Sequence, residues 1–263
     1  MNIKIGCTGW SYQGWSGVFY PKNLKSSEWL KYYSQIFDIT EINSTFYRIP
    51  AQEIVKRWNI DTSRYFRFTA KFPSIITHEK RLDRVNSEVF SFLSSLSPIH
   101  KKILALVFQL PPSLSFEEAK PRLSELFELL PEDFAYPIEA RHESWFTDEA
   151  ITFLKQNRYC LVWNEVAGVN NPMPITTDYL YVRLIGDRSI PESEFGKISK
   201  DRENLIEKFV NKLQKIKDIS LAMIMANNHF EGFSPATVNS LRIRLGMKEL
   251  TWEEKRQKTL GDF

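Results

Sequence analysis

The sequence predicts an α/β protein, a TIM-like (β/α)8 barrel that forms a single domain over residues 1–263. Short apolar runs alternate with longer amphipathic segments, eight such runs can be counted, and the chain length suits one barrel. The alternative is a doubly wound sheet, which needs a glycine-rich phosphate loop. The sequence has neither G-x-G-x-x-G nor a Walker motif.

The first half of the chain is expected to form four strands and three helices. The first strand leads into an aromatic loop at residues 10–20, and the second helix has a proline near its start, where the missing N–H costs nothing. Pro111 and Pro112 end the fourth strand because proline cannot donate to a sheet. The strands are expected at residues 4–8, 38–43, 65–71 and 103–109, the helices at 27–37, 50–59 and 87–96, and a loop at 73–82.

The second half repeats this alternation with one departure. Leucine and phenylalanine recur at helical spacing before the fifth strand. Between strands six and seven the sequence is rich in proline and asparagine and has no helical pattern, so we expect an irregular connection. The strands are expected at residues 134–139, 158–164, 179–184 and 220–226, the helices at 116–130, 148–157, 203–216 and 235–245, and a charged peripheral tail after Leu250.

Composition indicates a cytoplasmic protein with a large core. The chain is 43% hydrophobic, and its formal charge of +3 permits an anionic ligand without the strong basicity of a nucleic-acid coat. Cys7 and Cys160 lie in apolar runs, which is typical of reduced core thiols, and a single disulfide between them is the alternative. No signal peptide or membrane span is present, so no membrane partner is expected. Nothing in the residues defines an oligomeric state.

The segment of residues 137–145, P-I-E-A-R-H-E-S-W, carries an unusual density of charge. In a strand, Glu139 and Arg141 point to the same face, and His142 follows where the strand opens into a loop. The alternative is a solvated turn in which Ser144 or Thr147 caps the next helix.

Polar residues end seven of the predicted strands, where barrel active sites lie. We predict that Glu41 and Glu139 act as acid and base, and that basic side chains bind an anion or lower the carboxylates' pKa values. A closed ion-pair network that fills the top of the barrel is the competing interpretation. The predicted catalytic residues are Glu41, Glu139, Lys71 and His142, and the predicted substrate-binding residues are Asn43, Tyr47, Arg48, Gln109, Arg141, Trp145, Asn164, Tyr181, Arg183 and Asn227.

Loop aromatics lie near these strand ends. They could stack on a sugar or a base, or form a hydrophobic lid on the barrel rim. A nucleic-acid partner is compatible with a basic flank in the same region. The aromatics are Trp10, Tyr12, Trp15, Phe19, Tyr20, Phe46, Tyr47, Trp145 and Phe146, and the flank comprises Arg48, Lys71, Lys80, Arg81 and Arg84.

Histidine spacing does not support a metal site, and no cofactor is assigned. None of the four histidines stands in an H-E-x-x-H pattern. A divalent metal bound by Glu41, Glu139 and His142, with His78 or His229, stays possible because barrel ligands come from different strands. Lys71 could also form a Schiff base if it is desolvated.

Six motifs in order along the chain resemble the YecE-like family, also called domain of unknown function 72. They are I-G-C-T-G-W-S-Y at residues 5–12, E-I-N-S-T-F-Y-R at 41–48, F-Q-L-P-P at 108–112, E-A-R-H-E-S-W at 139–145, Y-V-R-L at 181–184 and N-N-H at 227–229. The resemblance implies a TIM-like barrel and no particular reaction. Its motifs include most of the predicted site residues, but Asn164 stands where the family pattern often has aspartate.

The leading functional hypothesis is a hydrolase that acts on an anionic substrate, a phosphoester or a nucleic-acid fragment, at the C-terminal mouth of the barrel. One alternative is a barrel that binds nucleic acid or a phospho-ligand without turnover. Another is a sugar isomerase or lyase that works through Lys71.

Overall fold

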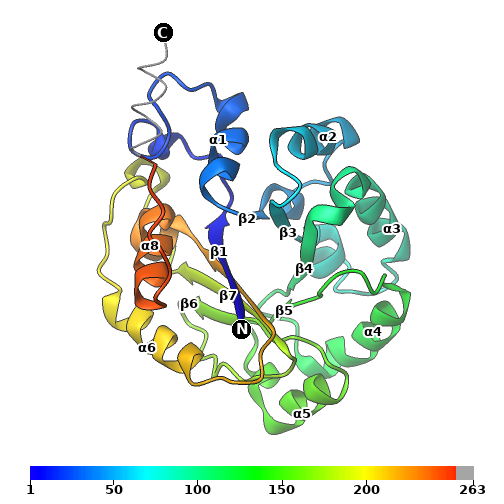
Figure 1. The fold of residues 1–263 in the computed structure, drawn as a ribbon. Helices are drawn as coiled ribbons and strands as arrows, with labels where there is room; N and C mark the ends of the chain where they lie inside the picture. The colour runs from blue at the N-terminus through cyan, green and yellow to red at the C-terminus, as the bar shows by residue number, and fades with distance from the viewer. Residues whose placement is uncertain (253–263) are drawn as a thin grey trace.

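The computed structural model describes residues 1–252, and its eight parallel strands confirm the predicted TIM-like barrel (Figure 1). The sheet order is β5-β4-β3-β2-β1-β8-β7-β6. Its two ends meet where Ile138 of β5 bridges Leu161, just before β6. The strands are β1 (Asn2–Thr8), β2 (Ile39–Ile42), β3 (Arg67–Lys71), β4 (Ile103–Gln109), β5 (Ile138–Glu139), β6 (Trp163–Val166), β7 (Tyr179–Gly186) and β8 (Leu221–Ala226).

Helices surround the strands (Figure 1), and all seven predicted helices are present. Thr147 caps α5 by accepting a hydrogen bond from the Ala150 N–H, a cap that belonged to the alternative interpretation of residues 137–145. The short helix α7 was not predicted because four residues cannot show a helical repeat. The helices are α1 (Trp29–Ile36), α2 (Gln52–Asp61), α3 (Asn86–Ser95), α4 (Phe116–Leu129), α5 (Asp148–Gln156), α6 (Glu203–Gln214), α7 (Asn228–Glu231) and α8 (Ser234–Arg244).

The structure tests three local predictions. Strand β5 is shorter than predicted because Pro137 has no N–H to donate to the sheet. The Pro137 carbonyl oxygen still accepts a hydrogen bond from the Phe108 N–H at 2.9 Å. Residues 73–82, expected as a loop, contain a π-helical turn at Ile75–Glu79. The connection between β6 and β7 has no helix, as predicted. The predicted tail lies mostly outside the described residues.

The barrel interior is apolar near the N-terminal ends of the strands and polar near their C-terminal ends. Ile39, Val107 and Met223 pack in the apolar part. Gly6 is required there, because a Cβ atom on this residue would lie 2.1 Å from the carbonyl oxygen of Ile39. Farther along the strands, Glu41 and its polar neighbours replace the apolar side chains, which places a buried charged layer under the barrel mouth.

Candidate functional site

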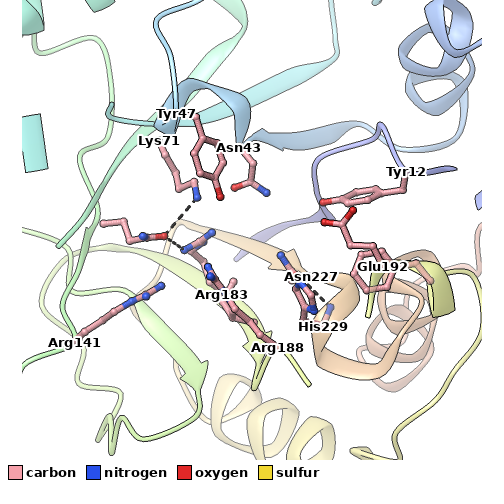
Figure 2. Close-up of a pocket in the computed structure, with 13 residues that line it drawn as sticks. Tyr12, Asn43, Tyr47, Lys71, Arg141, Arg183, Arg188, Glu192, Asn227 and His229 are labelled. Carbon is pink, nitrogen blue, oxygen red and sulfur yellow. Dashed lines mark hydrogen bonds between the residues drawn. The ribbon is translucent and has the colours of Figure 1, made fainter. Parts of the chain in front are cut away.

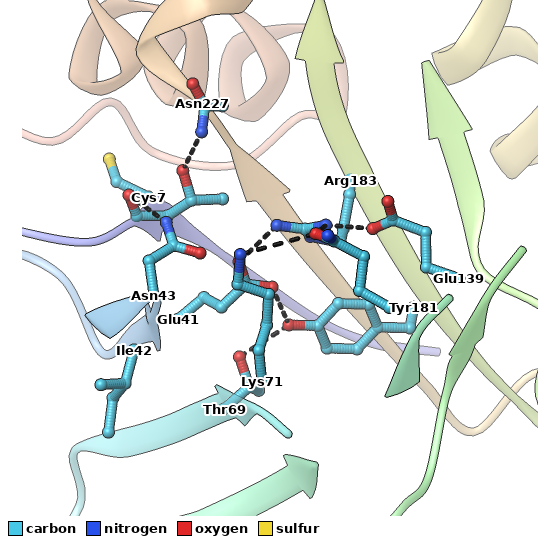
Figure 3. A network of polar contacts seen from close by, with 12 residues as sticks. Cys7, Glu41, Ile42, Asn43, Thr69, Lys71, Glu139, Tyr181, Arg183 and Asn227 are labelled. Carbon is cyan, nitrogen blue, oxygen red and sulfur yellow. Dashed lines mark hydrogen bonds and ion pairs between the residues drawn. The ribbon is translucent and has the colours of Figure 1, made fainter. Parts of the chain in front are cut away.

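Arg183 of β7 lies at the centre of the buried charged layer (Figure 3). Its side chain is only 2% exposed. Its Nη2 atom donates to Glu41 Oε1 at 2.7 Å, and its Nη1 atom donates to Glu139 Oε2 and, at 3.3 Å, to Gln109 Oε1. One guanidinium therefore joins carboxylates from opposite parts of the barrel.

The remaining carboxylate oxygens also have partners. The Tyr181 hydroxyl donates to Glu41 Oε2 at 2.8 Å, and the Arg141 guanidinium donates twice to Glu139 Oε1, at 2.7 and 2.9 Å. Burial alone would raise the pKa of Glu139, but the charges of Arg183 and Arg141 outweigh it and lower this pKa to about 2. Both glutamates are fully buried.

Strand register brings these side chains to one level. Glu41 is paired with Thr69 across β2 and β3, and Gln109 with Glu139 across β4 and β5. Alternate residues of a strand share a face, so the barrel interior also receives Arg183 two residues after Tyr181. The alternation of side chains along each strand thus places these residues in one network.

A cavity of about 290 Å³ opens above this layer (Figure 2). Its cationic lining comes from the ends of β3, β5 and β7 and from the loop after β7. Amides of Asn43, Gln109 and Asn227 contribute neutral polar groups. The cations are Lys71, Arg141, Arg183 and Arg188.

Lys71 has an unusual environment for an ammonium group. The residue is 6% exposed, and its Nζ atom lies 3.5 Å from Gln109 Oε1 and 4.7 Å from the centre of the Phe46 ring. Among residues 1–252, no carboxylate lies within ion-pairing distance of Lys71. Burial, followed by the positive charge of Arg183, lowers the pKa of Lys71 to about 8.

The opposite wall of the cavity contains Tyr12, Glu192, Phe195 and His229. His229 Nδ1 lies 3.0 Å from the carbonyl oxygen of Ile190, which can only accept a hydrogen bond. The neutral imidazole therefore carries its proton on Nδ1 and leaves Nε2 as an acceptor. Burial lowers the pKa of His229, which favours this neutral form.

Comparison with known proteins gives the family. The model of the family described as "Protein of unknown function DUF72" matches residues 4–260. The chain belongs to the DUF72 family.

Two curated relatives are similar to this chain in sequence. UPF0759 protein YecE of Escherichia coli K12 is 34% identical over 144 residues, which are 55% of this chain and 50% of that protein. UPF0759 protein YunF of Bacillus subtilis 168 is 29% identical over 58% of this chain and 57% of that protein. The chain thus spans about half the length of the curated relatives it matches.

Solved DUF72 structures match nearly the whole chain. A DUF72 family protein from Thermotoga maritima has a TM-score of 0.77 and 26% identity, and the match covers 94% of this chain and all of that one. A DUF72 family protein from Enterococcus faecalis has a TM-score of 0.75 at 20% identity, covering 94% of this chain and 96% of that one, and shows the fold alone.

In this DUF72 chain the predicted site residues separate into three groups. Those at the cavity are Asn43, Tyr47, Lys71, Gln109, Arg141, Arg183 and Asn227, and those beneath it are Glu41, Glu139 and Tyr181. Four lie outside the cavity lining, namely Arg48, His142, Trp145 and Asn164.

Arg48 is exposed, and the side chains of the other three members of the third group have local structural contacts. His142 Nδ1 accepts from the Ser144 N–H and caps a turn. Trp145 is fully buried and donates to the Leu114 carbonyl oxygen at 3.0 Å. Asn164 donates to the Ala140 carbonyl oxygen at 3.3 Å.

The loop aromatics differ in their burial. Trp15, Phe19 and Tyr20 are buried and pack against one another, whereas Tyr12 reaches the cavity. Tyr47 stands at the cavity rim with 76% of its surface exposed.

The predicted basic flank is partly neutralised. Lys80 pairs with Glu88 at 2.6 Å, and Arg81 pairs with Glu118 at 2.6 Å. Only part of this surface is therefore free to contact an anion.

Sequence reasoning missed the residues that the loop after β7 brings to the cavity. Arg188, Glu192 and Phe195 lie in the loop after β7. The sequence prediction considered only residues at the ends of strands, so it did not include them. The signal was the length of this loop, since long loops after barrel strands commonly carry functional residues.

The possible metal ligands are not assembled. Within residues 1–252, no three His, Cys, Asp or Glu side chains are grouped so that they could hold a metal ion, and this includes the set of Glu41, Glu139 and His142. In the same part of the chain, no helix is long and apolar enough to cross a bilayer.

Proposed function

We propose that the barrel mouth binds a small phosphoester substrate and hydrolyses it. The observation that carries this proposal is Lys71, a nearly buried ammonium at the cavity that has no carboxylate partner among residues 1–252. An anionic ligand would supply the missing counter-charge. Arg141 and Arg183 add guanidinium groups, which suit the geometry of phosphate.

In this proposal the two glutamates position the arginines and do not exchange protons. Both carboxylates are buried and all four of their oxygens have partners, which leaves none of them facing the substrate. This role replaces the acid and base roles inferred from the sequence. Glu41 and Glu139 fix the direction of the Arg183 donors.

Lys71 and His229 are the proposed proton carriers. Hydrolysis begins when water attacks phosphorus and the bond to the leaving oxygen breaks. Neutral His229 accepts the proton of the water through Nε2, and the Lys71 ammonium donates a proton to the leaving oxygen. Both residues line the same cavity.

The cavity size favours a small substrate over a long nucleic acid. A volume of about 290 Å³ is near the lower end for small-molecule sites. Cytoplasmic location is part of the proposal, and the two free, buried cysteines agree with a reducing compartment.

A second candidate function is a lyase or isomerase that forms a Schiff base on Lys71. It is favoured by the lowered pKa of this lysine, because a neutral amine is the nucleophile in such chemistry. Borohydride would trap the adduct with a phosphorylated aldehyde or ketone. A panel of such compounds that gives no increase in protein mass would exclude this candidate for those compounds.

Calorimetry with inorganic phosphate tests the binding step. We expect millimolar phosphate to bind and to stabilise the protein, with affinity that falls as salt rises. Lys71→Met and Arg141→Gln should each weaken binding about tenfold. Arg158→Gln is the matched control, because Arg158 pairs with Asp178 before β7, away from the mouth.

Turnover is tested with p-nitrophenyl phosphate and its diester, with and without Mg²⁺. Lys71→Met and His229→Gln should lower the rate constant more than they weaken substrate binding. Phosphate that fails to bind the unaltered protein would refute the anion site. Hydrolysis that survives both substitutions would refute the proton carriers.

A further inference from the structure

The cavity is electrically asymmetric. Lys71, Arg141 and Arg183 lie together on one side, whereas Glu192 lies across the cavity beside Tyr12 (Figure 2). The lining also contains the Arg188 guanidinium and the neutral imidazole of His229. A second anionic group on the ligand would meet the Glu192 carboxylate and be repelled.

Glu192 has a free hydrogen-bonding capacity. Glu192 is exposed, and among residues 1–252 its carboxylate accepts no hydrogen bond and forms no ion pair. A carboxylate is an acceptor only, so it suits a ligand that offers hydroxyl groups. Two adjacent hydroxyls can bond to its two oxygens.

An adjoining hollow of about 340 Å³ extends the site on the Glu192 side. It shares Tyr12, Glu192 and Phe195 with the main cavity, and the Tyr12 and Phe195 rings are 5.8 Å apart in an edge-to-face arrangement. Its other side chains are small or neutral and polar. They are those of Ser11, Gln13 and Ser193.

The wall between the two spaces is fixed by close packing. A Cβ atom on Gly14 would lie 2.2 Å from the carbonyl oxygen of Phe195, so the loop after β1 and the loop after β7 are in tight contact. The arrangement of Tyr12, Phe195 and Glu192 is therefore built into the fold.

We propose that the ligand is a sugar phosphate, whose phosphate binds Lys71, Arg141 and Arg183 and whose adjacent hydroxyls bind Glu192. The carbon skeleton then lies beside Tyr12 and Phe195, where aromatic faces favour the C–H surfaces of a sugar. This inference rests on the proposed function and adds the identity of the uncharged part of the substrate. It commits to a hydroxyl-rich ligand and excludes a bisphosphate.

Calorimetry with four probes tests the inference, namely inorganic phosphate, ethyl phosphate, ribose 5-phosphate and glucose 6-phosphate. At least one sugar phosphate should bind about tenfold or more tightly than ethyl phosphate, as expected for hydrogen bonds to a charged group. Glu192→Gln should remove most of that gain and leave ethyl phosphate binding unchanged or slightly tighter. Glu194→Gln is the matched control, because Glu194 ends the same short turn but lies outside both spaces.

The outcomes separate the two proposals. If neither phosphate nor any of the esters binds, the proposed function is overturned and the inference with it. Equal affinity for ethyl phosphate and both sugar phosphates would overturn the inference alone, as would a sugar gain that Glu192→Gln leaves intact. Uridine 5′-monophosphate is the final comparison. Binding tighter than that of ribose 5-phosphate and independent of Glu192 would point to a base and contradict a sugar site.

Discussion

Arg183 Nη2 lies 2.7 Å from Glu41 Oε1, and both side chains are buried in the middle of the barrel. The same guanidinium bonds to Glu139, so one positive charge is shared by two carboxylates. Because Arg141 supplies the second positive charge, the four groups are balanced. The layer beneath the cavity is a closed network, and the cavity above it is open.

Replacing Arg183 should destabilise the protein strongly. Arg183→Met leaves Glu41 and Glu139 buried without their shared partner, a change that typically costs about 3–5 kcal/mol. Urea unfolding at neutral pH measures this loss. The exposed control Arg158→Gln should change the free energy of unfolding by less than about 1 kcal/mol. Equal effects of the two substitutions would contradict a buried network.

Glu139 should make the protein sensitive to acid. Its folded-state pKa of about 2 is below the ordinary value of 4.5, so its stabilising contribution is present above pH 4.5 and is lost as the pH falls toward 2. The difference corresponds to about 3 kcal/mol. Glu139→Gln should flatten the fall of the unfolding free energy below pH 4.5, whereas Glu194→Gln should not. An unchanged slope in Glu139→Gln would refute the lowered pKa.

The sequence was sufficient to predict the barrel and the strand-end residues, because strand alternation and the rule for barrel active sites depend only on local pattern. It could not predict whether Glu41 and Glu139 face a ligand or an arginine. That outcome depends on distances between residues more than 100 positions apart, such as Glu41 and Arg183. Nor could periodicity place Glu192, because the path of a loop depends on the surface on which it packs.

Asn164 should be poorly replaced by the aspartate that the family pattern suggests. Its Nδ2 atom donates to the Ala140 carbonyl oxygen, and its Oδ1 atom accepts from Asn171 at 3.0 Å. Asn164→Asp places a buried carboxylate against the carbonyl oxygen, which should cost about 1–3 kcal/mol at neutral pH. Because burial beside a carbonyl oxygen raises the pKa of the new carboxyl group, its protonation as the pH falls below 7 should recover part of the loss relative to the unaltered protein. Full stability of Asn164→Asp at pH 7 would contradict this account.

Lys71 should destabilise the fold at neutral pH. Its folded-state pKa of about 8 is below the ordinary value of 10.5, so the unfolded chain holds the proton more tightly. The free energy of unfolding should therefore rise between pH 8 and pH 10.5. Lys71→Met should lose this rise and be at least as stable as the unaltered protein at pH 7. Lys102→Met should instead be destabilising, because the Lys102 ammonium donates hydrogen bonds to Asn59 and Thr62.

Ligand binding should reverse the effect on Lys71. A bound phosphate favours the ammonium form and raises the pKa of Lys71, so binding near pH 8 should take up a proton. Calorimetry in buffers with different heats of ionisation measures this uptake, which Lys71→Met should reduce and Lys102→Met should leave unchanged. Phosphate binding without proton uptake at pH 8 would mean that the anion binds elsewhere. Uptake that depends on Lys71 would identify this ammonium as the group that the ligand neutralises.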